Sequence, residues 1–166
     1  MGGAVSLFPL PPGEVDPGLW PEMLLYAGTV LLEAEGEPDP GPLGVAFVIR
    51  TRMDRAHTSI RTVVLGVDGL AQGDGRPYEA FSCFNDDYVA QRKARLTAPD
   101  PQRWERAWRA ACSAYWHLVP DPTFGATHYL NEALTRQIRP KGDLPSWYDP
   151  NRVTIRIGRH AFLNLG

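Results

Sequence analysis

The spacing of apolar and polar positions predicts helices along the first two thirds of the chain. An apolar run from Met23 to Leu32 is typical of a helix packed in a core, and Gly36 and Pro38 end it soon after Glu33. Apolar residues recur at helical spacing in three further stretches. Two of these stretches begin at residues that favour the start of a helix, Ser59 and Pro101. The predicted helices are 22–33, 43–55, 60–65 and 101–115.

The last third of the chain changes character. Residues 153–157 alternate Val or Ile with Thr or Arg, and a second apolar stretch, 160–163, follows Gly158. This pattern predicts a β-hairpin near the C-terminus. Glycine-, proline- and aspartate-rich stretches at 68–77, 121–125 and 140–150 are predicted loops, and 78–84 permits a strand or an extended loop.

These elements predict an α+β domain that is mostly helical with a small antiparallel sheet. Residues 1–21 contain five prolines and form a predicted arm, packed on the surface through Leu19 and Trp20. No repeat or linker divides residues 22–166, so a single domain with one core is expected.

Charge and composition narrow the classes of partner. The net charge is only -2, but the charges are unevenly distributed. The segment before Arg50 contains seven acids and no Lys or Arg, whereas the remainder contains 17 bases and 12 acids. This asymmetry suits a polar or anionic polymer held between an acidic and a basic surface. Without a dense Lys/Arg run, nucleic acid is not expected as a partner, and no apolar run approaches the roughly 20 residues of a membrane span.

The start of the chain, 1–10, has no basic residue and too short an apolar run for a signal peptide, so synthesis in the cytoplasm without an export signal is expected. Cys83 and Cys112 are predicted to be reduced core thiols, although one bridge between them is possible. The histidines are scattered and no HExxH motif is present, so neither a metal nor another cofactor is expected.

Glu33 is the first candidate for chemistry. It lies in the last turn of the first predicted helix, directly after Val30, Leu31 and Leu32, whose apolar surface favours a protonated carboxyl. Such a group can act as a general acid near neutral pH. The neighbouring acids Glu35 and Glu37 are predicted to be solvated, as charged residues usually are.

Three separate segments carry the polar and aromatic side chains that line sugar sites: Phe81 to Asn85, Gly125 to Asn131, and Pro145 to Tyr148. Aromatic faces stack on pyranose rings, while Ser, Asn and His bond hydroxyl and acetamido groups. Taken singly, each of these residues could equally serve a turn or fill a structural role.

Together with Glu33, the order of these motifs resembles the SleB/CwlJ-type cell wall hydrolases, a family of spore-cortex-lytic enzymes and related phage lysins. The motifs occur in the order Glu-Ala-x-Gly-Glu-Pro, Phe-Ser-Cys-x-Asn, Asp-Pro-Thr-x-Gly-Ala-Thr-His-Tyr-x-Asn, Pro-x-Trp and Ile-Gly-x-His-x-Phe. The resemblance runs from Leu24 to Phe162. Three positions depart from the usual pattern, with Glu35, Pro42 and Thr51 in place of Arg, Gln and Asn.

The resemblance implies a lysozyme-like, two-lobed domain that cuts peptidoglycan glycan strands between N-acetylmuramic acid and N-acetylglucosamine. It implies a lytic transglycosylase in which Glu33 acts as acid and then base. Asp86 or Asp87 would be the second carboxylate if the enzyme were a hydrolytic muramidase. The residues that match the cleft walls or lie in its motifs are Ser82, Asn85, His128, Tyr129, Asn131 and Trp147.

Two other classes stay open at this point: a silent glycan-binding or virion module, and a zinc amidase using His128, Glu132 and His160. A phage-type endolysin that acts as a monomer on the cell wall, after release from the cytoplasm or from a virion, is the expected biological form. The sequence leaves open the product type, the chemistry of the host wall, a phage or cellular origin and the oligomeric state.

Overall fold

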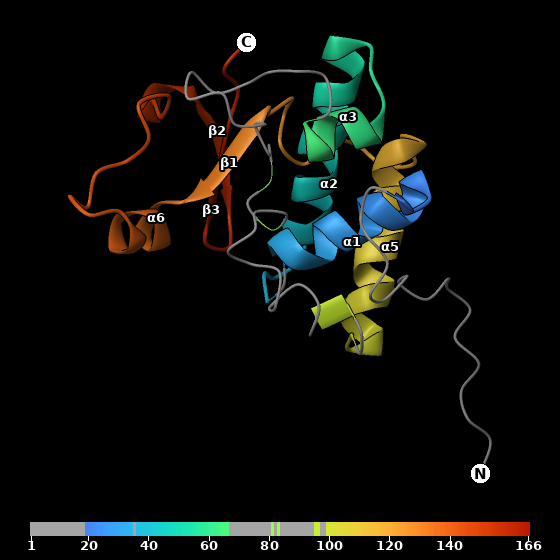
Figure 1. The fold of residues 1–166 in the computed structure, drawn as a ribbon. Coiled ribbons are helices and arrows are strands. Elements are labelled where there is room, and N and C mark those ends of the chain that lie inside the picture. The colour runs from blue at the N-terminus through green and yellow to red at the C-terminus, as the bar shows by residue number, and fades with distance from the viewer. Residues whose placement is uncertain (1–18, 35, 67–80, 82, 84–94, 97–98) are drawn as a thin grey trace.

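The computed structural model describes residues 19–34, 36–66, 81, 83, 95–96 and 99–166. It has an α+β fold, as predicted. The helices are α1 (Glu22–Ala34), α2 (Gly41–Ala56), α3 (Ile60–Leu65), α5 (Pro101–Tyr115) and α6 (Glu132–Ile138). The strands are β1 (His128–Asn131), β2 (Val153–Ile157) and β3 (His160–Leu163), and a 3-10 helix, Pro150–Arg152, precedes β2. Helices α1, α2, α3 and α5 lie on one side, and a small antiparallel sheet lies on the other together with α6 (Figure 1).

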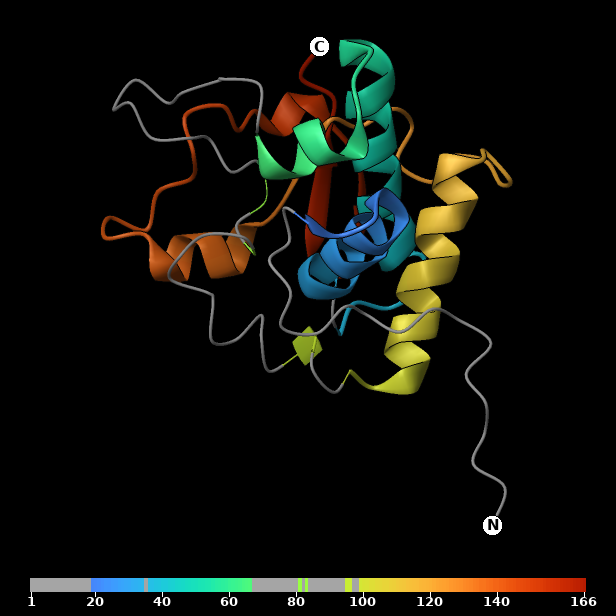
Figure 2. The ribbon, with the colours of Figure 1, turned by 45° about the vertical axis from the view of Figure 1, so that its right-hand side comes forward.

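Helix α1 is the centre of the helical part. Its residues from Leu25 to Leu32 are all buried, which explains why the sequence there is apolar on every face. Helices α2, α3 and α5 all contact it, and Figure 2 shows α5 running along the outside of this group. Trp20 is buried against α1, as predicted, but Leu19 is 76% exposed and does not anchor the arm.

The predicted helix ends agree closely with the structure because local signals set them. The Ser59 hydroxyl caps α3 by accepting a hydrogen bond from the backbone N–H of Thr62 (3.2 Å). Asp100 caps α5 in the same way by accepting from the N–H of Arg103 (2.9 Å), and Pro101 occupies the first turn.

The three strands form one antiparallel sheet in the order β1-β3-β2. The predicted hairpin is therefore confirmed, and β1 adds to it by pairing with β3, Tyr129 opposite Phe162 and Asn131 opposite His160. One face of the sheet packs on α2, where Val48 contacts Phe162 and Ile157 in a small apolar cluster. Gly44 makes this approach possible, since a Cβ there would lie 2.7 Å from Cζ of Phe162.

Polar contacts shape the segment before β1 and hold it against α2. Asp121 accepts hydrogen bonds from the backbone N–H groups of Thr123 (2.7 Å) and Gly125 (2.8 Å), which shapes the turn before β1. Arg52 of α2 donates to the carbonyl oxygen of Thr127 (2.5 Å). These bonds fix the start of β1, and hence the position of Tyr129, relative to the helices.

Candidate functional site

Glu33 lies in the last turn of α1, half-buried, where the end of that helix meets the sheet. Its Oε1 accepts a hydrogen bond from the backbone N–H of Cys83 (3.0 Å). Its Oε2 accepts another from the hydroxyl of Tyr129 (2.9 Å). Donors from two distant chain segments therefore fix the orientation of the carboxyl group, which is what a proton donor or acceptor in a defined geometry requires.

Tyr129 is the predicted site residue that the structure brings to Glu33. Its ring packs against the rings of Phe81, His160 and Phe162, at centroid distances of 6.4, 5.2 and 5.8 Å. Burial, and then the nearby charge of Glu33, raise the pKa of the Tyr129 hydroxyl well above its usual range. The hydroxyl therefore stays protonated and remains a donor to Glu33.

His160 belongs to the same group, although it was not among the predicted cleft residues. Its side chain is buried, and its Nδ1 has no hydrogen-bond partner among the described residues. Burial lowers the pKa of His160, and the charge of Arg159 lowers it further, while the carboxylates of Glu37 and Glu33 act in the opposite direction. His160 thus lies in the field of both carboxylates. The motif Ile-Gly-x-His-x-Phe contained this residue, but its alternation indicated only a strand.

Glu37 corrects the expectation of a solvated acidic turn, because it is only 2% exposed. Its Oε1 accepts from Nε of Arg159 (2.7 Å) and its Oε2 accepts from the backbone N–H of Arg159 (2.9 Å). Burial alone would raise the pKa of Glu37, but these two hydrogen bonds, with the charges of His160 and Arg159, hold it below its usual range. Glu37 thereby ties the end of α1 to the β2–β3 turn.

Gly158 is what allows Glu37 to reach that turn. Its φ is +57°, and a Cβ at this position would lie 2.1 Å from Oε2 of Glu37. Any larger residue would both strain the backbone and displace the carboxylate.

The other predicted residues that the structure describes do not bond to Glu33. His128 contacts Trp147 (5.2 Å between ring centroids), and its Nδ1 lies 3.0 Å from the Thr127 hydroxyl oxygen. Burial, and then the charge of Arg52, lower the pKa of His128 to about 4, so this ring is neutral near pH 7. Asn131 caps α6 by accepting from the N–H of Leu134 (3.0 Å), the structural role that the sequence left open.

Several predicted residues lie outside the part of the chain that the structure describes: Glu35, Ser82, Asn85, Asp86 and Asp87. Cys83 and Cys112, both described, form no disulfide with each other, as predicted, but they are partly buried rather than fully in the core.

A metal site is not assembled from the residues the structure describes, since no three His, Cys, Asp or Glu side chains among them lie close enough to share an ion. Glu132, the acid of the zinc alternative, accepts a hydrogen bond from the Tyr148 hydroxyl and pairs with Arg156 (2.8 Å).

In the same described ranges, no helix is both long and apolar enough to cross a membrane.

Comparison with protein families matches residues 36–163 to the model of the Cell Wall Hydrolase family. The match covers most of the chain, and the protein belongs to this family, of the SleB/CwlJ type. The match begins three residues after Glu33, so it includes Tyr129, Glu37 and His160 but not Glu33 itself. Comparisons with curated proteins and with solved structures found no match. Family membership supports an enzyme that degrades peptidoglycan.

Proposed function

We propose that this cell wall hydrolase is a lytic transglycosylase that cuts the bond between N-acetylmuramic acid and N-acetylglucosamine, with Glu33 as its acid and base. The observation that carries the proposal is the double hydrogen bond to the Glu33 carboxyl, from Cys83 N–H and Tyr129 hydroxyl. A fixed, half-buried carboxyl at the junction of helices and sheet is the group that this reaction needs.

In the first step, the Glu33 carboxyl gives its proton to the glycosidic oxygen while the bond from that oxygen to the muramic C1 breaks. N-acetylglucosamine leaves with its new hydroxyl, and positive charge develops at C1. The Cys83 N–H and the Tyr129 hydroxyl stabilise the carboxylate that forms on Glu33, because hydrogen bonds to a charged acceptor are stronger than those to a neutral one.

In the second step, the Glu33 carboxylate removes the proton of the muramic C6 hydroxyl, whose oxygen then bonds to C1. The product is a 1,6-anhydro ring, and the proton from the C6 hydroxyl replaces the one that Glu33 gave in the first step. The cycle consumes no water and requires one carboxyl group.

The alternative is a hydrolytic muramidase, which usually requires a second carboxylate about 5–9 Å from the acid. Glu37 follows Glu33 by four residues, but both of its oxygens already bond to Arg159, so it is unsuited to that role. Asp86 and Asp87 stay the candidates for a hydrolytic reaction. The phage-type endolysin role also stays a prediction from the sequence.

Mass spectrometry of the soluble fragments released from purified peptidoglycan tests the proposal. A lytic transglycosylase produces fragments that end in 1,6-anhydromuramic acid and are lighter by one water than hydrolytic fragments. Fragments that carry reducing muramic acid ends would overturn the transglycosylase assignment in favour of the muramidase. Fragments cut only at peptide or amide bonds would overturn glycan cleavage altogether.

A further inference from the structure

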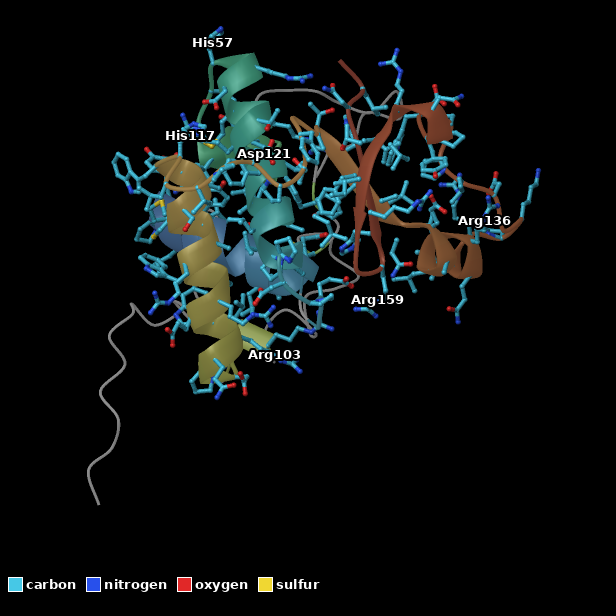
Figure 3. The ribbon with its side chains drawn as sticks, turned by 180° about the vertical axis from the view of Figure 1, so that it is seen from behind. His57, Arg103, His117, Asp121, Arg136 and Arg159 are labelled. Atoms are coloured by element: carbon cyan, nitrogen blue, oxygen red, sulfur yellow. The ribbon has the colours of Figure 1, made fainter. Side chains whose placement is uncertain are left out.

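An open groove of about 450 Å³ lies beside the candidate site and has no role in the mechanism above. One wall is α6, with Ala133, Leu134 and Gln137, and the other is the β2–β3 hairpin, with Arg156 and Arg159. Asn131 and Glu132 complete the lining. Figure 3 shows Arg159 at the tip of the hairpin, next to α6. The volume falls within the range of sites for small ligands.

The groove offers many more hydrogen-bond donors than acceptors. Arg159 uses its Nε and backbone N–H on Glu37, and its two Nη groups bond to nothing in the described ranges. The side-chain amide of Gln137 has no partner among the described residues, and only the Oδ1 of Asn131 is engaged. Arg156 pairs with Glu132 but keeps its Nε free of any described partner. A ligand rich in acceptors, such as a carboxylate flanked by amide carbonyls, complements this lining.

The α6 wall adds an apolar surface. This helix buries none of its residues, and Leu134 in the groove is 50% exposed. This wall can therefore contact small apolar groups of a ligand. The combination fits an extended peptide with carboxylate groups better than it fits a sugar ring, since the groove lining itself contains no aromatic residue.

The groove also lies where a peptide attached to the substrate would pass. Asn131 stands two residues after Tyr129 on β1, about 7 Å along the strand. It pairs with His160, while Arg159 bonds to Glu37 at the other wall. The inner end of the groove is therefore next to the group that surrounds Glu33. In peptidoglycan, the peptide stem branches from the muramic acid itself, the sugar that reacts.

We propose that this groove binds the peptide stem of peptidoglycan, with Arg156, Arg159 and Gln137 bonding the carboxylates and carbonyls of the stem and Leu134 contacting its alanine methyl groups. The inference rests on the proposed function, because it assumes a muramic acid residue positioned at Glu33. It makes the enzyme selective for glycan strands that still carry their stems.

The test compares two substrates: peptidoglycan freed of accessory anionic polymers, and the same glycan after an amidase has removed the stems. For the wild-type enzyme we expect a KM at least about tenfold lower on the stem-bearing strands, the value of one hydrogen bond to a charged group. In the double variant Arg156→Gln/Gln137→Ala the ratio of the two KM values should fall several-fold towards 1, since Arg159 and Leu134 remain in the groove. Arg136→Gln is the matched control, because Arg136 lies on α6 but not in the groove (Figure 3), and it should keep the wild-type ratio.

If the wild-type enzyme has a KM ratio of about 1, or if the double variant keeps the wild-type KM ratio, the proposal that the groove binds the stem is overturned. Glycan cleavage itself is unaffected by either result. Failure of the proposed function is recognised separately, as the absence of glycan cleavage from both substrates. In that case the groove is tested by titrating the Glu33→Gln protein with free stem tetrapeptide. Shifts of the Gln137 side-chain amide signals in NMR support the groove, and unchanged signals at millimolar peptide overturn it.

Discussion

The hydroxyl of Tyr129 donates a hydrogen bond to Oε2 of Glu33 over 2.9 Å, although 96 positions separate the two residues. The bond connects the last turn of α1 to β1, and so links the helical part of the fold to the sheet at the candidate site. The position of the Glu33 carboxyl therefore depends on the docking of the sheet against α2, where Phe162 packs over Gly44.

Replacing Tyr129 by phenylalanine tests this bond. Tyr129→Phe keeps the ring and its aromatic contacts but removes the donor to Glu33. We expect kcat to fall by roughly tenfold, the value of one hydrogen bond to a charged group, and far less than for a change at Glu33. Lysis rates on purified walls provide the measurement, with Tyr115→Phe on α5 as the control. A loss as large as that of Glu33→Gln would mean that the single-acid mechanism is incomplete.

The pair of Glu37 and Arg159 should make stability depend on acid pH. The folded protein holds the pKa of Glu37 below its ordinary value of 4.5, so the stabilisation is complete above that pH and is lost as the pH falls through the lower folded value. Glu37→Gln should cost about 2 kcal/mol in the free energy of unfolding at pH 7, since Arg159 is partly exposed to water.

Urea unfolding of the wild type and Glu37→Gln at several pH values measures this difference. The difference in the free energy of unfolding between the two proteins should become smaller below pH 4.5. Glu105→Gln is the control, because Glu105 forms an exposed pair with Arg109 on α5 and should change stability little. An equal effect of both substitutions would contradict the view that the buried Glu37 connects α1 to the hairpin.

His128 should remain neutral well below the pH at which histidines usually titrate. Its folded pKa is about 4, against an ordinary value of 6.5. Between these values the unfolded chain binds more protons than the folded one, so His128 contributes stability above pH 6.5 that is lost as the pH falls towards 4. NMR titration of its ring carbons should give a midpoint near 4. A midpoint near 6.5 would show that the ring is solvated and does not pack against Trp147.

Local signals in the sequence predicted the elements that depend on local chemistry. Ser59 and Pro101 marked two helix starts, and the alternation after Val153 identified the hairpin. Helix α6 was missed, since it buries no residue and its apolar positions therefore follow no core-facing pattern. Its cap, Asn131, looked instead like a residue that binds sugar.

The candidate site was predicted only in part, because its contacts join distant segments. Glu33 stood out through its apolar neighbours, and the family resemblance added Tyr129. Nothing near Glu37 in the sequence indicated burial, since its partner Arg159 lies 122 positions away. The same holds for His160, whose proximity to both carboxylates follows from the sheet register and the hairpin turn.

The lysis rate of the Glu33→Gln protein tests whether Glu33 is the acid and base of glycan cleavage. The amide has the same shape, so circular dichroism should show an unchanged fold, whereas Glu22→Gln at the exposed start of the same helix should retain wild-type activity. We predict a loss of at least about a thousandfold for Glu33→Gln, as expected when a general acid is removed. A folded Glu33→Gln protein that kept more than about a tenth of the wild-type rate would contradict the claim, because general acid catalysis alone is worth on the order of a hundredfold or more.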